Sequence, residues 1–140
     1  MKFNTRYALQ ADYPRIKTLY EHWGHAFADS IHDQFFVVET EGGVVGVIKL
    51  SFEGLNFVVR GLYVHPDWRQ KGIGSELLRA VTTELGITEA YSIAPTSNHS
   101  LLSENGFSEI TGIGAPEFLR ARTQNLVESG TSVSLMKKSS

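Results

Sequence analysis

A short loop rich in glycine and positive charge is the stretch of this sequence best suited to chemistry. It reads Arg69-Gln70-Lys71-Gly72-Ile73-Gly74-Ser75. A helix is expected directly after it, and a helix start carries unpaired backbone N–H groups and the positive end of the helix dipole. Gly72 and Gly74 leave those N–H groups accessible. Arg69 and Lys71 add positive charge, and the Ser75 hydroxyl can donate to a phosphate. The loop therefore predicts a site for a diphosphate-bearing ligand.

Two common phosphate-binding motifs do not match this loop. A P-loop needs Gly-Lys-Ser/Thr after its glycines, and a dinucleotide fingerprint needs a third glycine where Leu77 stands. The loop instead resembles the coenzyme A loop of the GNAT acetyltransferase superfamily, Arg/Gln-x-x-Gly-x-Gly/Ala, which Arg69 to Gly74 match at every fixed position. The residues before it also resemble that family; they are Leu62-Tyr63-Val64-His65-Pro66-Asp67-Trp68.

The flanking residues predict the elements that position the loop. Residues 58–64 are β-branched, aliphatic or aromatic at most positions, which favours a buried strand, and Pro66 ends it. The segment after the loop predicts an amphipathic helix that ends at Gly86. Its apolar residues share one face; they are Ile73, Leu77, Leu78, Val81 and Leu85.

The rest of the chain predicts further strands and helices. We expect strands at 3–9, 35–39, 44–52, 90–94, 107–110 and 132–136. We expect helices at 13–23, capped by Asp12, at 97–104 and at 116–130, with a loop or short helix at 25–32. The order indicates an α/β fold, a mixed sheet of about six to seven strands flanked by helices, with one right-handed β-α-β crossover. The GNAT fold has a similar order, so the resemblance covers nearly the whole chain.

The resemblance implies where coenzyme A would lie. In the GNAT fold the fourth and fifth strands, here 58–64 and 90–94, splay apart, and the pantetheine arm lies in the notch between them. Gly61 is placed to supply a bulge that bends the fourth strand away.

The resemblance also implies an activity, transfer of an acetyl group from acetyl-CoA to the amine of a small molecule or peptide. A backbone N–H around Leu62, Tyr63 and Val64 would bind the carbonyl oxygen. Asn98 would hydrogen-bond the pantetheine, although it is also suited to cap the following helix.

Two residues that handle protons in many members of the family are absent. Arg60 stands where many members have a glutamate, and Leu102 where many have a tyrosine. No catalytic side chain is therefore assigned, although positioning and desolvation supply much of the rate in such transfers. A coenzyme A-binding sensor or interaction module without turnover is the main alternative. A nucleotide-binding module of another kind is a second.

The acceptor side offers fewer signals. Arg60 can either pair with a nearby acid or bind a substrate carboxylate. His22 and His25 form a His-x-x-His pair in which His25 could contact the substrate or act as a base, but no further ligand pattern supports a metal site. Tyr20 and Trp23 are interpreted as core residues.

Composition bounds the remaining possibilities. The 140 residues suit a single domain, 1–140, of globular composition, 41% hydrophobic and 20% charged. The net charge of −2 gives no general footprint for nucleic acid or a membrane surface. With no cysteine, a cysteinyl intermediate is excluded. No membrane span or signal peptide is recognised, so a cytoplasmic location is expected.

The insertion at 115–130 is expected to be a substrate-side lid or a contact in a possible homodimer.

Overall fold

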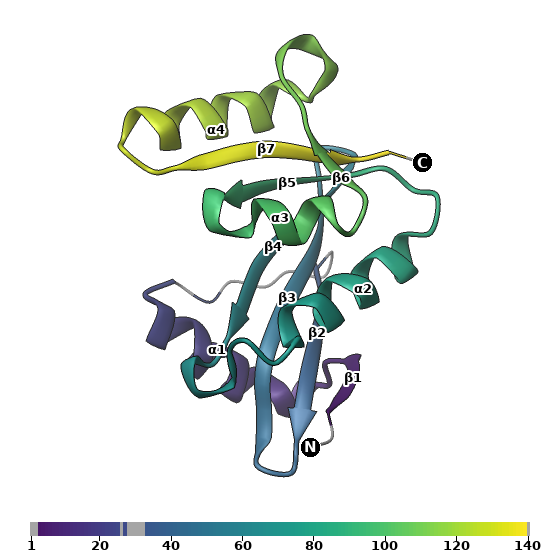
Figure 1. Ribbon diagram of the computed structural model, residues 1–140, viewed down its shortest axis with the longest axis vertical. Helices are drawn as coiled ribbons and strands as arrows, with labels where there is room; N and C mark the ends of the chain where they lie inside the picture. Colours follow the sequence, from purple (N-terminus) through teal and green to yellow (C-terminus); the bar gives the residue numbers. More distant parts are fainter. Residues whose placement is uncertain (1–2, 26, 28–32, 140) are drawn as a thin grey trace.

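The computed structural model describes residues 3–25, 27 and 33–139. In these residues one mixed seven-stranded sheet has the order β1-β2-β3-β4-β5-β7-β6 (Figure 1). The β4–β5 pair is parallel and the other neighbouring strands are antiparallel. The predicted α/β fold is confirmed. The strands are β1 (Asn4–Tyr7), β2 (Asp33–Thr40), β3 (Gly43–Glu53), β4 (Asn56–Val64), β5 (Ala90–Pro95), β6 (Phe107–Glu109) and β7 (Val133–Lys138).

Four α-helices in the described residues cover the two faces of the sheet; they are α1 (Tyr13–Trp23), α2 (Ile73–Leu85), α3 (His99–Ser103) and α4 (Glu117–Glu128). The predicted apolar stripe of α2 packs against Ile48 and Val59 on one face, where α3 also lies. Residues alternate between faces along a strand. Val47 and Val58 therefore face the other side, where α1 packs against Val47 and α4 packs against Val58. None of these helices is long and apolar enough to cross a membrane.

The sheet opens between β4 and β5, as predicted (Figure 1). These strands pair at two positions, Phe57 with Ala90 and Val58 with Tyr91. At the next position the buried Ser92 hydroxyl donates to the Val59 carbonyl at 2.8 Å. Past that point β5 runs beside β7 and away from β4. The opening leaves a notch between the two strands.

A bulge in β4 lies beside this notch. In the β3–β4 register Val47 faces Tyr63 and Lys49 faces Arg60, so β4 has one residue more than β3 in this interval. Gly61 takes a φ of +64°, a left-handed conformation that favours glycine. The Tyr20 hydroxyl donates to the Gly61 carbonyl at 2.7 Å and ties α1 to the bulge. The predicted bulge is therefore present.

The expected capping role of Asp12 differs from the structure. Asp12 precedes α1, but its side chain makes no cap hydrogen bond to that helix. Its carboxylate instead accepts two hydrogen bonds from the Arg6 guanidinium, at 2.7 and 3.0 Å, and one from the Leu9 backbone N–H. The loop or short helix expected at 25–32 falls mostly outside the described residues.

The Arg6–Asp12 pair should make stability depend on acid pH. Hydrogen bonds from Arg6 lower the pKa of Asp12 in the folded state, while an unfolded aspartate has a pKa of about 3.9. The pair therefore stabilises the fold above that value and loses its effect as pH falls through the folded-state pKa. Asp12→Asn should lower stability at pH 7, and its difference from the wild type should vanish at the acid end of a urea-unfolding series. Glu41→Gln, on the exposed β2–β3 turn, is the control; an Asp12→Asn deficit that persists in acid would contradict the assignment.

Candidate active site

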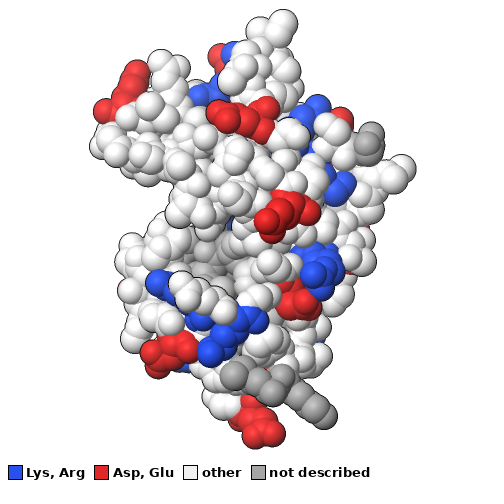
Figure 2. Space-filling model, viewed as in Figure 1, with Lys and Arg blue, Asp and Glu red and all other residues white. Residues whose placement is uncertain are grey.

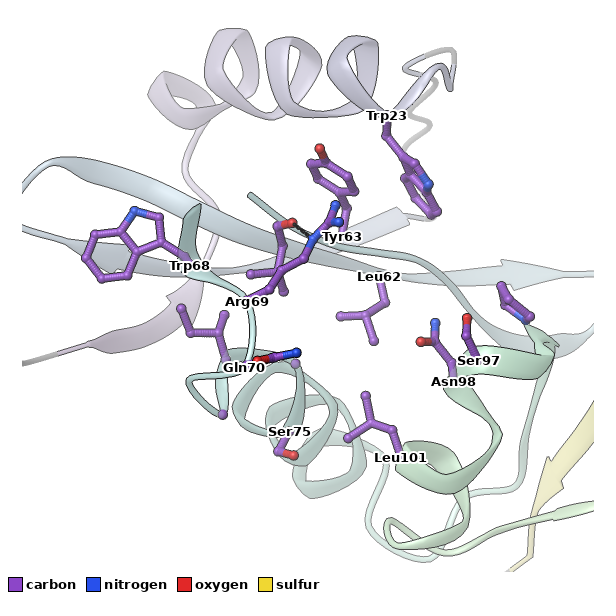
Figure 3. Close-up of a pocket in the computed structure, with 15 residues that line it drawn as sticks. Trp23, Leu62, Tyr63, Trp68, Arg69, Gln70, Ser75, Ser97, Asn98 and Leu101 are labelled. Carbon is purple, nitrogen blue, oxygen red and sulfur yellow. Dashed lines mark hydrogen bonds between the residues drawn. The ribbon is translucent and has the colours of Figure 1, made fainter. Parts of the chain in front are cut away.

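A cavity of about 580 Å³ lies where α2 begins, between the end of β4 and the start of α3 (Figure 3). All residues predicted to bind coenzyme A line it except Lys71, which is exposed. In Figure 3 the side chain of Leu62 points between Asn98 and Leu101, which come from across the cavity. The fold thus brings β4, the loop and the α3 region together around one space.

The glycine-bearing loop leads into α2, and the first residues of this helix line the cavity. Gln70 and Gly72 have φ angles of +61° and +82°, and this pair of left-handed residues turns the chain into the helix. Gly72 occupies the N-cap position without a side-chain cap, so the first N–H groups of α2 have no side-chain partner there. A Cβ on Gly74 would lie 3.3 Å from Leu101 Cδ2. Glycine at this position therefore also permits the close approach of α3.

Arg69 is exposed, and its side chain folds back along β4. Its Nε donates to the Val64 carbonyl at 2.9 Å, and its guanidinium lies 5.4 Å from the centre of the Tyr63 ring (Figure 3). These contacts fix the first residue of the loop to the strand that precedes it. They also place a permanent positive charge on the cavity wall, beside the start of α2.

A second cavity, of about 560 Å³, adjoins the first. The two share lining from Trp23, Leu62, Pro95 and Asn98, so they meet where β4 and β5 separate. Figure 2 shows this notch between the part of the molecule that carries α4 and β7 and the part that carries α1. The two cavities therefore adjoin each other at the opening in the sheet.

The predicted acceptor-side residues both line the second cavity. Arg60 pairs with Glu53 at 2.8 Å, which is the first of its two interpretations, and it also lines the second cavity. His25 stacks on Trp23, with 3.8 Å between ring centres. Leu102, in place of the tyrosine, is buried on the wall and offers no proton. No cluster of metal-ligating side chains exists in the described part of the chain.

The two aromatic residues interpreted as core have different positions. Tyr20 is core, 5% exposed, and burial raises the pKa of its hydroxyl, which keeps it protonated. Trp23 is only partly buried, stacks on Tyr63 at 5.1 Å between ring centres and lines both cavities. The core assignment of Trp23 is therefore incomplete, because the tryptophan forms the wall where the cavities meet. Asn98 also lines both cavities, and its side chain makes no cap hydrogen bond to α3.

Four polar residues of the second cavity were not assigned to a site from the sequence; they are Lys49, Ser92, Arg122 and Thr131. Lys49 could have been recognised from the sequence, because it is the one charged residue in the otherwise apolar stretch 44–50. Arg122 comes from α4, the helix that fills the predicted insertion. This places part of the insertion on the wall of the second cavity.

Solved structures that share this fold include a synthase, a protein complexed with coenzyme A and an N-acetyltransferase. N-acetylglutamate synthase from Neisseria gonorrhoeae, complexed with coenzyme A and N-acetyl-glutamate, is 19% identical with a TM-score of 0.71 over 99% of this chain and 35% of its own. Rv2747 from Mycobacterium tuberculosis, complexed with coenzyme A, is 18% identical with a TM-score of 0.74, over 98% and 99% of the two chains. The Escherichia coli ribosomal-protein-S18-alanine N-acetyltransferase is 16% identical with a TM-score of 0.73, over 99% and 96%.

Comparison with protein-family models identifies the family from the sequence itself. A search of curated proteins finds no significant match. The acetyltransferase (GNAT) domain model matches residues 32–109, more than half of the chain, and this range contains β4, the glycine-bearing loop, α2, β5 and α3. The chain therefore belongs to the GNAT acetyltransferase family.

Proposed function

We propose that this protein is an N-acetyltransferase that moves the acetyl group of acetyl-CoA to an amine. The observation that carries the proposal is the junction of two cavities at the splayed strands, one beside the glycine-bearing loop and one beside α4. Such a junction lets a thioester enter from one side of the sheet and an amine from the other. The complexes of the synthase and of Rv2747 with coenzyme A support the same ligand here.

In this proposal the first cavity holds coenzyme A. The diphosphate lies over the N–H groups at the start of α2, where the helix dipole favours negative charge and Arg69 adds to it. Ser75 and Gln70 line the same wall and can donate further hydrogen bonds. Asn98 is placed to bind the amide groups of the pantetheine, since its side chain has both donors and an acceptor.

The thioester supplies an activated acetyl group, and the protein positions its carbonyl against the acceptor. During transfer the amine nitrogen forms a bond to the carbonyl carbon, the carbon–sulfur bond breaks and the thiolate leaves. Negative charge develops on the carbonyl oxygen, and a backbone N–H in the Leu62–Val64 segment, next to the bulge, is our proposed donor to it. Because a bulge removes one residue from the ladder, it can turn a backbone group toward a ligand.

The amine must lose a proton to attack. No described carboxylate lines the second cavity. His25 lines it and is the type of side chain that exchanges protons near neutral pH. We therefore propose that His25 contacts the acceptor amine and accepts its proton, directly or through water, while Trp23 holds the imidazole by stacking.

Calorimetric titration with acetyl-CoA, coenzyme A, ATP and NAD tests the cofactor, and thiol release over a panel of amines tests turnover. Both coenzyme A species should bind and the two nucleotides should not. The protein has no cysteine and so adds no thiol background. Binding without turnover over the whole panel would favour a coenzyme A sensor, and failure of both coenzyme A species to bind would overturn the proposal.

A further inference from the structure

Two positive side chains stand opposite each other on the floor of the second cavity. Lys49 of β3 and Arg60 of β4 are partners in the strand register and both line this cavity. Like charges directly opposite on neighbouring strands destabilise a sheet. Lys49 and Arg60 lie on the same face of the sheet as Val47 and Val58. On that face α1 packs over Val47 and α4 packs over Val58, so the two cations lie between the two helices. Each of the two has an acidic partner, Asp33 for Lys49 and Glu53 for Arg60, and both cations still line the cavity.

A third cation reaches the same cavity from α4. The guanidinium of Arg122 lies 5.6 Å from the centre of the Phe118 ring, which is one turn earlier in the helix. Phe118 in turn packs over Gly54, where an added Cβ would lie 2.9 Å from the ring. These contacts dock α4 on the β3–β4 hairpin. Arg122 therefore reaches the cavity from a helix that is packed against the β3–β4 hairpin.

One carboxylate serves both arginines. Glu53 accepts from Arg60 Nη1 at 2.8 Å through Oε2, and from Arg122 at 3.4 and 3.5 Å through Oε1. The Arg122 contacts are at the long limit for hydrogen bonds. Two guanidinium groups thus share a single negative charge, and Glu53 itself does not line the cavity. Lys49 pairs with Asp33, which also does not line it. The charged side chains that do line it are cations.

We propose that the acceptor is an amine that also carries a carboxylate, and that Arg60 and Arg122 bind this carboxylate. This inference rests on the proposed acetyltransferase function and names its substrate class. Guanidinium groups match a carboxylate in shape and charge through paired N–H donors. Lys49 adds positive charge from the neighbouring strand, and the acceptor amine then points toward Trp23 and His25, where the two cavities meet. Polycationic amines should be rejected by like-charge repulsion.

The test compares amines that differ in a single group. Matched pairs are glycine with glycinamide and β-alanine with β-alaninamide, with spermidine as a polycation and phosphoethanolamine as a different anion. Each is titrated into coenzyme A-loaded protein and assayed for acetylation with acetyl-CoA. At least one acid should bind and react better than its amide by about tenfold or more.

The result separates the two proposals. If coenzyme A does not bind, the acetyltransferase function fails and this inference fails with it. If coenzyme A binds but amides or spermidine react as well as the acids, or none of the acids binds, only the carboxylate-bearing acceptor is overturned. A clear preference for phosphoethanolamine would overturn the carboxylate as the recognised anion.

Variants of Arg122 test whether this residue binds the carboxylate of the acceptor. Arg122→Gln should reduce the acid-over-amide preference about tenfold and raise the KM for the acid, while the KM for acetyl-CoA stays unchanged. Arg122→Lys, which keeps the charge and loses the fork, should recover part of the preference. Arg79→Gln is the matched control, because Arg79 also pairs with a glutamate but lies outside both cavities. A preference unchanged in Arg122→Gln, with the fold intact by thermal unfolding, would remove Arg122 from the site.

Discussion

Gly72→Val should weaken the binding of coenzyme A by about 100-fold or more, which corresponds to about 2.7 kcal/mol. Gly72 has a φ of +82° at the N-cap of α2. A β-branched residue strains this conformation, and its side chain would stand over the N–H groups that we assign to the diphosphate. No other atom lies within 4 Å of the added Cβ. The loss should therefore appear in ligand binding more than in packing.

Gly106→Val separates backbone strain from ligand exclusion. Gly106 has a φ of +91° and also has no atom within 4 Å of an added Cβ, but it lies outside both cavities. Both variants should lose a similar amount of stability in denaturant unfolding, about 1–2 kcal/mol for a left-handed residue. Only Gly72→Val should lose affinity in calorimetry. Equal affinities in the two variants would show that the diphosphate does not lie over this loop.

Gly61→Ala should lower kcat/KM by about 100-fold, the loss typical of removing an oxyanion donor. An added Cβ would lie 2.6 Å from the Tyr20 hydroxyl, at a φ of +64° that disfavours alanine. Either α1 or the bulge must move. A shift of the bulge would displace the backbone around Leu62 from the position that we propose for the acetyl carbonyl.

A double variant identifies which contact is responsible. Tyr20→Phe alone removes one hydrogen bond and should cost about 1 kcal/mol of stability. Combined with Gly61→Ala, it removes the 2.6 Å contact and leaves the ring carbon Cζ at 3.2 Å. Activity should then recover in part, while the backbone strain remains. Full wild-type activity in Gly61→Ala itself would argue against a catalytic role for the bulge.

Much of this fold could be predicted because its signals are local. The strand before the loop, the loop glycines and the apolar stripe of α2 are contiguous, so residue type and period were enough to predict them. The bulge at Gly61 was also predictable, because few other residues adopt its conformation at low cost. The bounds of α1 were predicted as observed, while several strands differed at their ends by one or more residues, as expected where strand ends depend on tertiary contacts.

The proposed acceptor site was less predictable because its residues come from distant parts of the chain. Lys49, Arg60 and Arg122 meet only through the β3–β4 register and the packing of α4. Trp23 has the spacing of a core residue, and the sequence does not show that the sheet opens beside it. Asp12 pairs with Arg6 and makes no cap hydrogen bond to the helix it precedes. Long-range pairing therefore decided these roles, and local propensity did not reveal them.

The position of β7 has a consequence for how the protein folds during synthesis. β7 lies between β5 and β6, although both of those strands precede it in the chain. β5 has only two paired positions with β4, so most of its backbone pairing comes from β7. These contacts span long stretches of sequence, which slows folding. While β7 is still inside the ribosome, β5 and β6 lack their main partner, and the wall of the acceptor cavity that includes Val133 is completed last.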